Sequence, residues 1–243
     1  MFALLKKEIN SFLASVTGYV VIIVFLAITG LFAWILPTEF NIPQSHYATL
    51  DSLFILAPWV FMFLIPAITM RSFAEENKTG TIELLMTKPL SDFQIVFAKY
   101  LAGLLLVLIS LVPTLIYYVL IKYMATPVGN VDHGAIRGSY VGLFFLGSAY
   151  VAIGIFASSF SSNQVVAFIV AVLLSFIFYT GFDFISTLTP WQGINFILGQ
   201  IGINAHYNSL SRGVIDSRDA VYFISITFLF VLLSKFILEK RKW

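Results

Sequence analysis

Residues 16–36 read VTGYVVIIVFLAITGLFAWIL, a stretch of 21 residues without a charged side chain. A helix needs about 20 apolar residues to cross a hydrocarbon core of ~30 Å. This stretch therefore predicts a membrane-spanning helix. Further apolar stretches have the same character, and together they predict six spans, at residues 16–36, 53–70, 97–121, 140–160, 165–182 and 220–238.

The composition of the whole chain agrees with this interpretation. Of its 243 residues, 59% are hydrophobic and only 11% are charged, and the mean hydropathy is +0.94. Soluble domains contain about 45–50% apolar and about 25% charged residues. The chain has no cysteine and a net charge of only +2, which excludes disulfides and thiol nucleophiles and gives no indication of a nucleic-acid partner. We expect an all-α integral membrane protein, with residues 1–243 forming one transmembrane domain in the lipid bilayer.

The distribution of Lys and Arg predicts the orientation, because positively charged residues are enriched in cytoplasmic segments. If both termini are cytoplasmic, the outside loops hold only Lys122, Arg137, Arg212 and Arg218 of the 14 basic residues. The other ten are inside: Lys6, Lys7, Arg71, Lys78, Lys88, Lys99, Lys235, Lys240, Arg241 and Lys242. We therefore expect a multi-pass protein of a cytoplasmic membrane with both termini in the cytoplasm.

Two segments outside the spans are also apolar. Residues 1–15 place Phe2, Leu5 and Ile9 on one helical face, which predicts an amphipathic helix at the inner membrane surface, although a frayed basic N-terminus would carry the same charges. Residues 191–203 are too few to span a bilayer. We expect them to form a re-entrant segment inside a longer external segment, residues 185–218.

Several kinds of chemistry have no motif in this sequence. There is no G-x-x-x-x-G-K-[ST] pattern for binding nucleotide phosphates and no H-E-x-x-H pattern for zinc. The predicted spans also carry no ionisable residue near mid-depth, whereas ion-coupled carriers commonly do. We expect a chain that is not an enzyme, holds no cofactor or metal of its own, and draws its energy from another protein.

The densest cluster of charges lies between the second and third predicted spans. Residues 71–91 read RSFAEENKTGTIELLMTKPLS, and we call them the coupling segment. Gly80 permits a sharp turn, Thr81 is a plausible helix N-cap, and Glu83 would lie in a positively polarised first turn. Pro89 prevents the helix from continuing. We expect a short helix lying across the cytoplasmic face.

The start of the next helix has its own signature. Ser91 is followed three residues later by Gln94, the spacing of a capping box in which each side chain bonds the other residue's backbone N–H. The pair predicts that the long helix containing the third span begins directly after Ser91.

The coupling segment resembles the first cytoplasmic loop of ABC-2 type transporter permeases. Members of that family carry acidic residues, then Gly-Thr, an acidic-Leu-Leu stretch and a proline before the third span. The matching residues here are Glu75, Glu76, Gly80, Thr81, Glu83, Leu84, Leu85 and Pro89. With the N-terminal helix, the six spans and the apolar external segment, the resemblance covers nearly the whole chain. By overall likeness the sequence is most similar to the gliding-motility-associated permeases of Bacteroidota.

The resemblance implies a division of labour. A separate ABC ATPase subunit would bind ATP and Mg, and this chain would be a permease subunit in a bacterial inner membrane. A second permease chain would complete the pathway, and a heterodimer is favoured over a homodimer. The expected interface with the ATPase consists of Glu75, Glu76, Lys78, Gly80, Thr81, Glu83, Leu84, Leu85, Met86 and Pro89, with Leu84, Leu85 and Met86 as apolar anchors and the glutamates at the rim.

Two other functions are compatible with the same sequence. One is a non-transporting membrane component that uses ATPase strokes to drive an envelope machine, and it requires the same cytoplasmic segment. The other is an independent channel or carrier without an ATPase partner. The sequence identifies neither a transported substrate nor the residues that line a pathway.

Overall fold

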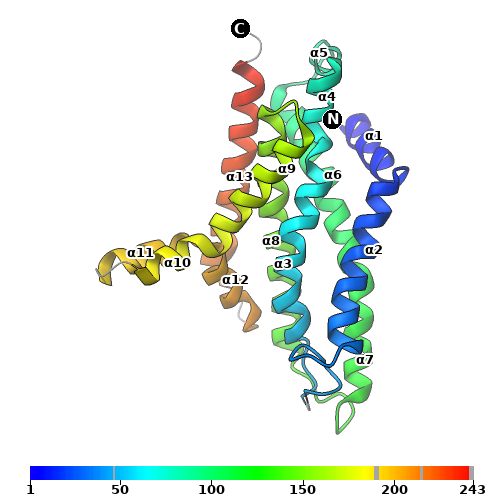
Figure 1. Ribbon diagram of the computed structural model, residues 1–243, viewed down its shortest axis with the longest axis vertical. Helices are drawn as coiled ribbons and strands as arrows, with labels where there is room; N and C mark the ends of the chain where they lie inside the picture. Colours follow the sequence, from blue (N-terminus) through cyan, green and yellow to red (C-terminus); the bar gives the residue numbers. More distant parts are fainter. Residues whose placement is uncertain (46, 189–191, 214–215, 241–243) are drawn as a thin grey trace.

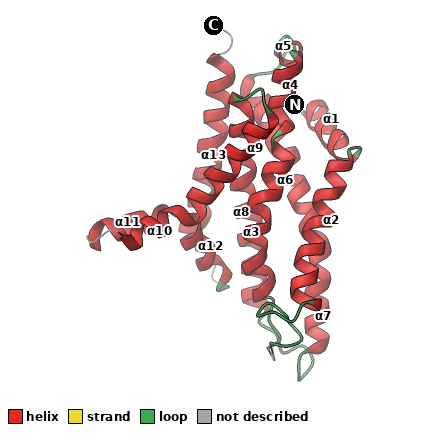
Figure 2. Cartoon of the chain, viewed as in Figure 1, coloured by secondary structure: helices red, strands yellow, loops and turns green. Residues whose placement is uncertain are grey.

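The computed structural model describes residues 1–45, 47–188, 192–213 and 216–240. Helices make up most of the described residues, and the loops gather mainly at the two ends of a long bundle (Figure 2). Six helices in the described part are long and apolar enough to cross a membrane: Val16–Ile35, Asp51–Thr79, Asp92–Met124, His133–Phe160, Gln164–Leu188 and Ser217–Lys240. The chain is therefore an all-α integral membrane protein with six candidate spans, as the sequence predicts.

Irregular turns interrupt several of these spans, so each contains more than one element. The first comprises α2 (Val16–Gly30) and a wide π-helical turn, η1 (Leu31–Ile35). The third comprises α6 (Asp92–Leu111), a tight turn η2 (Val112–Thr114) and α7 (Leu115–Met124). The turn η2 contains Pro113, which has no backbone N–H to continue the α-helical hydrogen bonds.

The second span continues beyond the predicted end of the apolar stretch. Helix α3 (Asp51–Thr69) passes through Met70 directly into α4 (Arg71–Thr79), and α5 (Thr81–Met86) follows after Gly80. Glu75 and Glu76 therefore lie on a helix that prolongs the span, whereas the sequence predicts them before a single short helix. Residues 71–79 form this helix because they contain neither Gly nor Pro.

The centre of the bundle is α8 (His133–Phe160), which packs against α3, α6 and α13 (Ser217–Lys240). Within its most apolar window, 78% of α8 is buried, compared with 22% for the fifth span. Small residues of α8 allow this close packing, and an added Cβ at Gly147 would meet Val107 while one at Gly154 would overlap Thr69. These contacts fix the position of α8 relative to α3 and α6.

The fifth span ends in a lateral arm. Helix α9 (Gln164–Phe176) passes through a π-helical turn, η3 (Ile177–Gly181), into α10 (Phe182–Leu188). Figure 1 shows α10 and α11 (Gln192–Ile201) projecting sideways from the bundle, and α12 (Ile203–Ser211) returning to it. Of the apolar segment 191–203, Trp191 lies outside the described residues, and the others form α11 and the start of α12 with a bend at Gly202.

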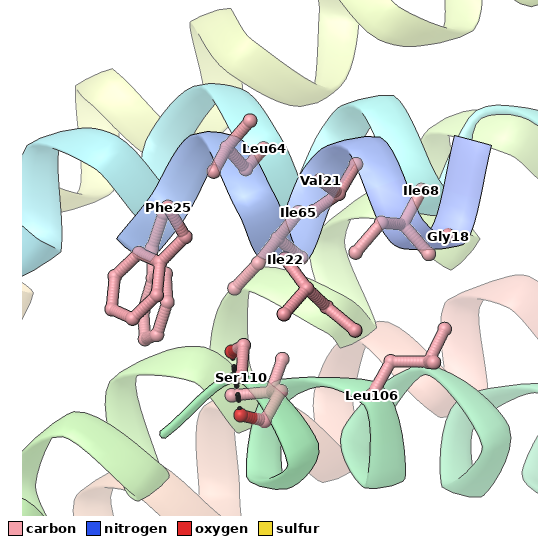
Figure 3. A pocket seen from close by; sticks show the side chains of 11 residues that line it. Gly18, Val21, Ile22, Phe25, Leu64, Ile65, Ile68, Leu106 and Ser110 are labelled. Atoms are coloured by element: carbon pink, nitrogen blue, oxygen red, sulfur yellow. Dashed lines mark hydrogen bonds between the residues drawn. The ribbon is translucent and has the colours of Figure 1, made fainter. Parts of the chain in front are cut away.

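The packing of α2, α3 and α6 leaves almost no free space. Figure 3 shows apolar side chains from these helices, including Phe25, Ile65 and Leu106, closing around a cavity of about 10 Å³. This is roughly enough space for a single water molecule. The Ser110 hydroxyl donates a hydrogen bond to the carbonyl of Val107, so the cavity presents little free polar chemistry. The apolar side chains of α2, α3 and α6 therefore pack tightly against one another.

Candidate functional site at the coupling segment

Helix α1 (Phe2–Leu13), α4, α5 and the start of α6 gather at one end of the bundle, where the last turn of α13 also lies (Figure 1). The connections at residues 37–50 and 125–132 lie at the opposite end (Figure 1). The end that carries the coupling segment is the candidate functional site.

Gly80 makes the turn between α4 and α5. Its φ is +72°, in the left-handed region that suits glycine, and an added Cβ would meet no atom within 4 Å. The prediction of Thr81 as the N-cap is wrong by one residue, because Gly80 occupies that position and Thr81 is the first residue of α5. The hydroxyls of Thr79 and Thr81 are hydrogen-bonded at 2.9 Å across the turn. Gly80 therefore sets the direction of α5.

The predicted capping box is present at the end of the segment. Gln94 donates its backbone N–H to Ser91 Oγ, and Ser91 donates its own to Gln94 Oε1. Helix α6 begins at Asp92 as a result, five residues before the predicted apolar span.

The apolar residues of α5 point in different directions. Ile82 and Leu85 are buried in the core of this chain, whereas Leu84 is 68% exposed. Residues three apart share a helix face, and this face of α5 is turned inward. Contrary to the expectation of an anchor for another protein, the Leu85 side chain packs within the chain here, and Leu84 is the leucine of α5 that is presented outward. The side chain of Met86 lies outside the described part of the structure.

The charged residues of the segment are also divided. Glu75, Lys78 and Glu83 are exposed, as is Pro89. Glu76 is largely shielded and points inward instead, with its Oε1 atom 3.0 Å from Lys99 Nζ. Of the predicted rim glutamates, only Glu75 and Glu83 are presented to the surroundings.

Lys99 is the centre of an ion cluster that joins three helices. Only 2% of this residue is exposed, and its Nζ donates to Glu8 Oε1 of α1 at 3.1 Å and to Glu76 Oε1 of α4 at 3.0 Å. A further hydrogen bond of 2.7 Å goes to the backbone carbonyl of Ser72. Such geometry is needed for buried charges, because their desolvation is offset only by close oppositely charged and hydrogen-bonding groups. The cluster fixes α1 and α4 to α6.

Glu8 is the member of this cluster that the sequence analysis missed. It is buried on the same face of α1 as Leu4, and this face packs toward α6. Lys99 itself indicated that such a partner exists, because a lysine inside an otherwise apolar helix is usually paired with an acidic or hydrogen-bonding group. Glu8 and Glu76 are 91 and 23 residues away from it, so the sequence alone did not identify which carboxylates pair with it.

Ser158 of α8 holds the junction between α3 and α4. Its Oγ accepts hydrogen bonds from the backbone N–H groups of Phe73 and Ala74, at 2.8 and 3.0 Å, and donates one to the carbonyl of Met70. The first N–H groups of a helix lack partners within it, and here α8 supplies one. These hydrogen bonds therefore tie the junction of α3 and α4 to α8, the most buried of the six candidate spans.

Comparison with known proteins connects this architecture to a family. The model of a family described as ABC-2 family transporter protein matches residues 37–201. The match covers more than half of the chain and includes the coupling segment, α8 and α9. No curated protein matches the chain significantly.

Proposed function

This chain belongs to the ABC-2 transporter family, and from that premise we propose that its coupling segment docks a separate ABC ATPase subunit. Family members are the membrane components of ABC transporters and are not themselves the ATPases. The observation that carries the proposal is the exposed Leu84 on α5, next to exposed Glu75 and Glu83, at the end of a helix that prolongs a membrane span.

The arrangement suits transmission of movement. Leu84 offers an apolar side chain that a groove on the ATPase could bury, while Glu75 and Glu83 would orient the partner through charge. Force on α5 reaches α4 through a single glycine turn. From α4 it reaches α8 through Ser158, and it reaches α1 and α6 through Lys99. The transmembrane helices would therefore follow the ATPase.

The remaining assignments rest on the family and on the charge distribution. ATP and Mg would be bound by the ATPase, because the sequence contains no phosphate-binding loop pattern. The pathway would require a second permease chain, for which we favour a different polypeptide. The membrane would be a bacterial inner membrane with both termini in the cytoplasm. Overall likeness to gliding-motility permeases supports a role in gliding motility or associated secretion.

A substitution at Leu84 tests the docking proposal. Leu84→Asp places a charge in the proposed apolar contact, so the ATPase should be lost from the complex purified in mild detergent through a tag on this chain. The measurement is the ratio of ATPase to permease by quantitative mass spectrometry. We expect that ratio to fall at least ten-fold, which corresponds to about 1.4 kcal/mol or more of binding free energy.

The matched control is Val128→Asp. Val128 is 67% exposed, almost the same as Leu84, but it lies in the loop at the opposite end of the bundle. We expect this variant to keep the full ratio of ATPase to permease. Retention of the ATPase by Leu84→Asp at the level of the control would rule out docking at α5.

A further inference from the structure

A crevice lies at the end of the bundle opposite the coupling segment. Its walls come from the first turns of α3, from α8, from η3 and from α12, and it encloses about 400 Å³. This volume is within the range of about 300–1,000 Å³ typical of small-molecule sites. The crevice is distant in the fold from α4, α5 and the Lys99 cluster.

Aromatic rings form much of its wall. Phe54 and Trp59 come from α3, Tyr179 from η3 and Tyr207 from α12. Trp59 and Tyr179 meet edge to face with ring centroids 5.7 Å apart, which holds the indole in place. Trp59 is 42% exposed, so one side of the indole remains available to another molecule.

The polar donors of the wall are largely occupied by the protein itself. Tyr207 donates to the carbonyl of Phe54 at 2.7 Å, a carbonyl that lacks its usual helical partner because the residue four positions later is Pro58. Burial raises the pKa of Tyr207 well above its usual value, so this hydroxyl keeps its proton and continues to donate. The Asn204 amide donates to Asp183 at 2.8 Å.

Acceptors are what remain for a ligand. Neither the Asp51 carboxylate nor the Asn208 side-chain carbonyl accepts a hydrogen bond from the described residues, and both residues are exposed. The Asn208 amide N–H₂ is already engaged, since it donates to the Asn204 carbonyl at 3.1 Å. No Lys or Arg is among the described lining residues. The crevice therefore combines an aromatic wall with free acceptors and one negative charge.

We propose that this crevice binds a cationic amphiphile, with its ammonium group on Asp51 and Asn208 and its apolar part against Trp59. An ammonium supplies the donors that these acceptors need, and an aromatic face attracts a cation as well as apolar surface. An anionic head group would be repelled by Asp51 and would itself supply a donor to neither acceptor. That the ligand is also export cargo rests on the proposed permease function, whereas its binding does not.

Three matched probes test the proposal on the full-length chain in phosphatidylcholine nanodiscs. Each is a dansyl-labelled undecyl chain, and they end in ammonium, hydroxyl or sulfonate. Binding is followed by energy transfer from tryptophan to dansyl, with Trp59→Phe to identify the part of the signal that comes from Trp59. We expect the ammonium probe to bind at least ten-fold more tightly than the sulfonate probe, with the hydroxyl probe between them.

Two carboxylate variants separate the site from general surface charge. Asp51→Asn should reduce the preference for ammonium over sulfonate to within about two-fold. Glu39→Gln removes one negative charge from an exposed loop at the same end of the bundle but outside the crevice. It should leave the preference for ammonium over sulfonate unchanged. Equal binding of ammonium and sulfonate by the unmodified chain would overturn the proposal, as would equal effects of the two variants.

The outcome is independent of the docking experiment. The nanodiscs contain no ATPase, so selective binding here together with an unchanged ATPase ratio in Leu84→Asp would refute docking at α5 and leave the crevice site intact. Loss of the ATPase from Leu84→Asp, together with equal binding of ammonium and sulfonate probes, would support docking at α5 and refute the crevice site.

Discussion

At the scale of single residues, Lys99 shows how one buried charge organises its neighbours. Its Nζ bonds α1 through Glu8 and α4 through Glu76 and Ser72, and it lies 5.0 Å from the centre of the Phe73 ring. All of these interactions depend on the ammonium group. Lys99 is therefore the buried charge that joins the N-terminal helix to the coupling segment.

Lys99→Met tests this dependence. The variant keeps most of the side-chain volume but leaves two shielded carboxylates with only the exposed Lys7 as a counter-charge. Breaking a buried ion pair in this way typically costs about 3–5 kcal/mol. We expect a clear fall in the thermal unfolding midpoint of the purified protein, measured by tryptophan fluorescence. Adding Glu8→Gln and Glu76→Gln to this variant should recover much of the loss, because no unpaired charge then remains.

Lys7→Met is the control for this experiment. Its Nζ lies 3.6 Å from Oε1 of both Glu8 and Glu76, but its side chain is 61% exposed. Exposed ion pairs typically contribute about 0–1 kcal/mol, so the unfolding midpoint should barely change. If Lys99→Met were as mild as Lys7→Met, the cluster would not be what attaches α1.

At the scale of elements, the contact between α8 and α3 decides where the coupling segment lies. Gly154 of α8 packs directly on Thr69, the last residue of α3, and Ser158 one turn later bonds the first residues of α4. The side chain of Thr69 is fixed by a hydrogen bond of 2.9 Å to the carbonyl of Ile65. There is consequently no space for a larger residue at position 154.

Gly154→Ala should destabilise the protein by about 1–3 kcal/mol, because its Cβ would overlap the Thr69 side chain and force the two helices apart. Gly199→Ala in α11 is the matched control, since a Cβ there would meet nothing within 4 Å. Alanine favours a helix over glycine by about 1 kcal/mol, so this control should be neutral or slightly stabilising. Unfolding midpoints of the two variants provide the comparison, and equal midpoints would contradict the close contact.

At the scale of the whole molecule, the even number of candidate spans places α1, α5 and the C-terminal end of α13 at one end of the bundle (Figure 1). The predicted orientation puts this end in the cytoplasm, with ten of the 14 basic residues. The orientation stays a prediction that labelling can test directly, because the chain contains no cysteine.

Single cysteines at two exposed positions report the orientation. Lys88→Cys lies in the coupling segment and Val128→Cys in the loop at the opposite end. With a membrane-impermeant maleimide on intact spheroplasts, we expect labelling of Val128→Cys only. Lys88→Cys should become reactive after permeabilisation, and the reverse order of labelling would place the coupling segment outside, where no ATP-driven partner could reach it.

Local patterns in the sequence predicted the local features of this protein. The six spans and the capping box of Ser91 and Gln94 were predicted correctly, because a span depends on consecutive apolar residues and a capping box on residues three apart. Errors arose where a residue's role depended on another helix. Leu85 was expected as an anchor for another protein, yet α5 turns it into the core. Glu76 was expected at the rim of that contact, yet it pairs with Lys99.

The sequence by itself therefore determined that this is a membrane protein with six apolar spans and a charged segment between the second and third. Hydrophobicity is a property of each stretch, and it needs no knowledge of the neighbours. Only the tertiary structure decided which charges pair, such as Glu8 with Lys99, and which rings and acceptors share a crevice, such as Trp59 with Asn208. Those groups come from helices far apart in the chain, and the packing of small residues such as Gly154 against Thr69 fixes how these helices lie.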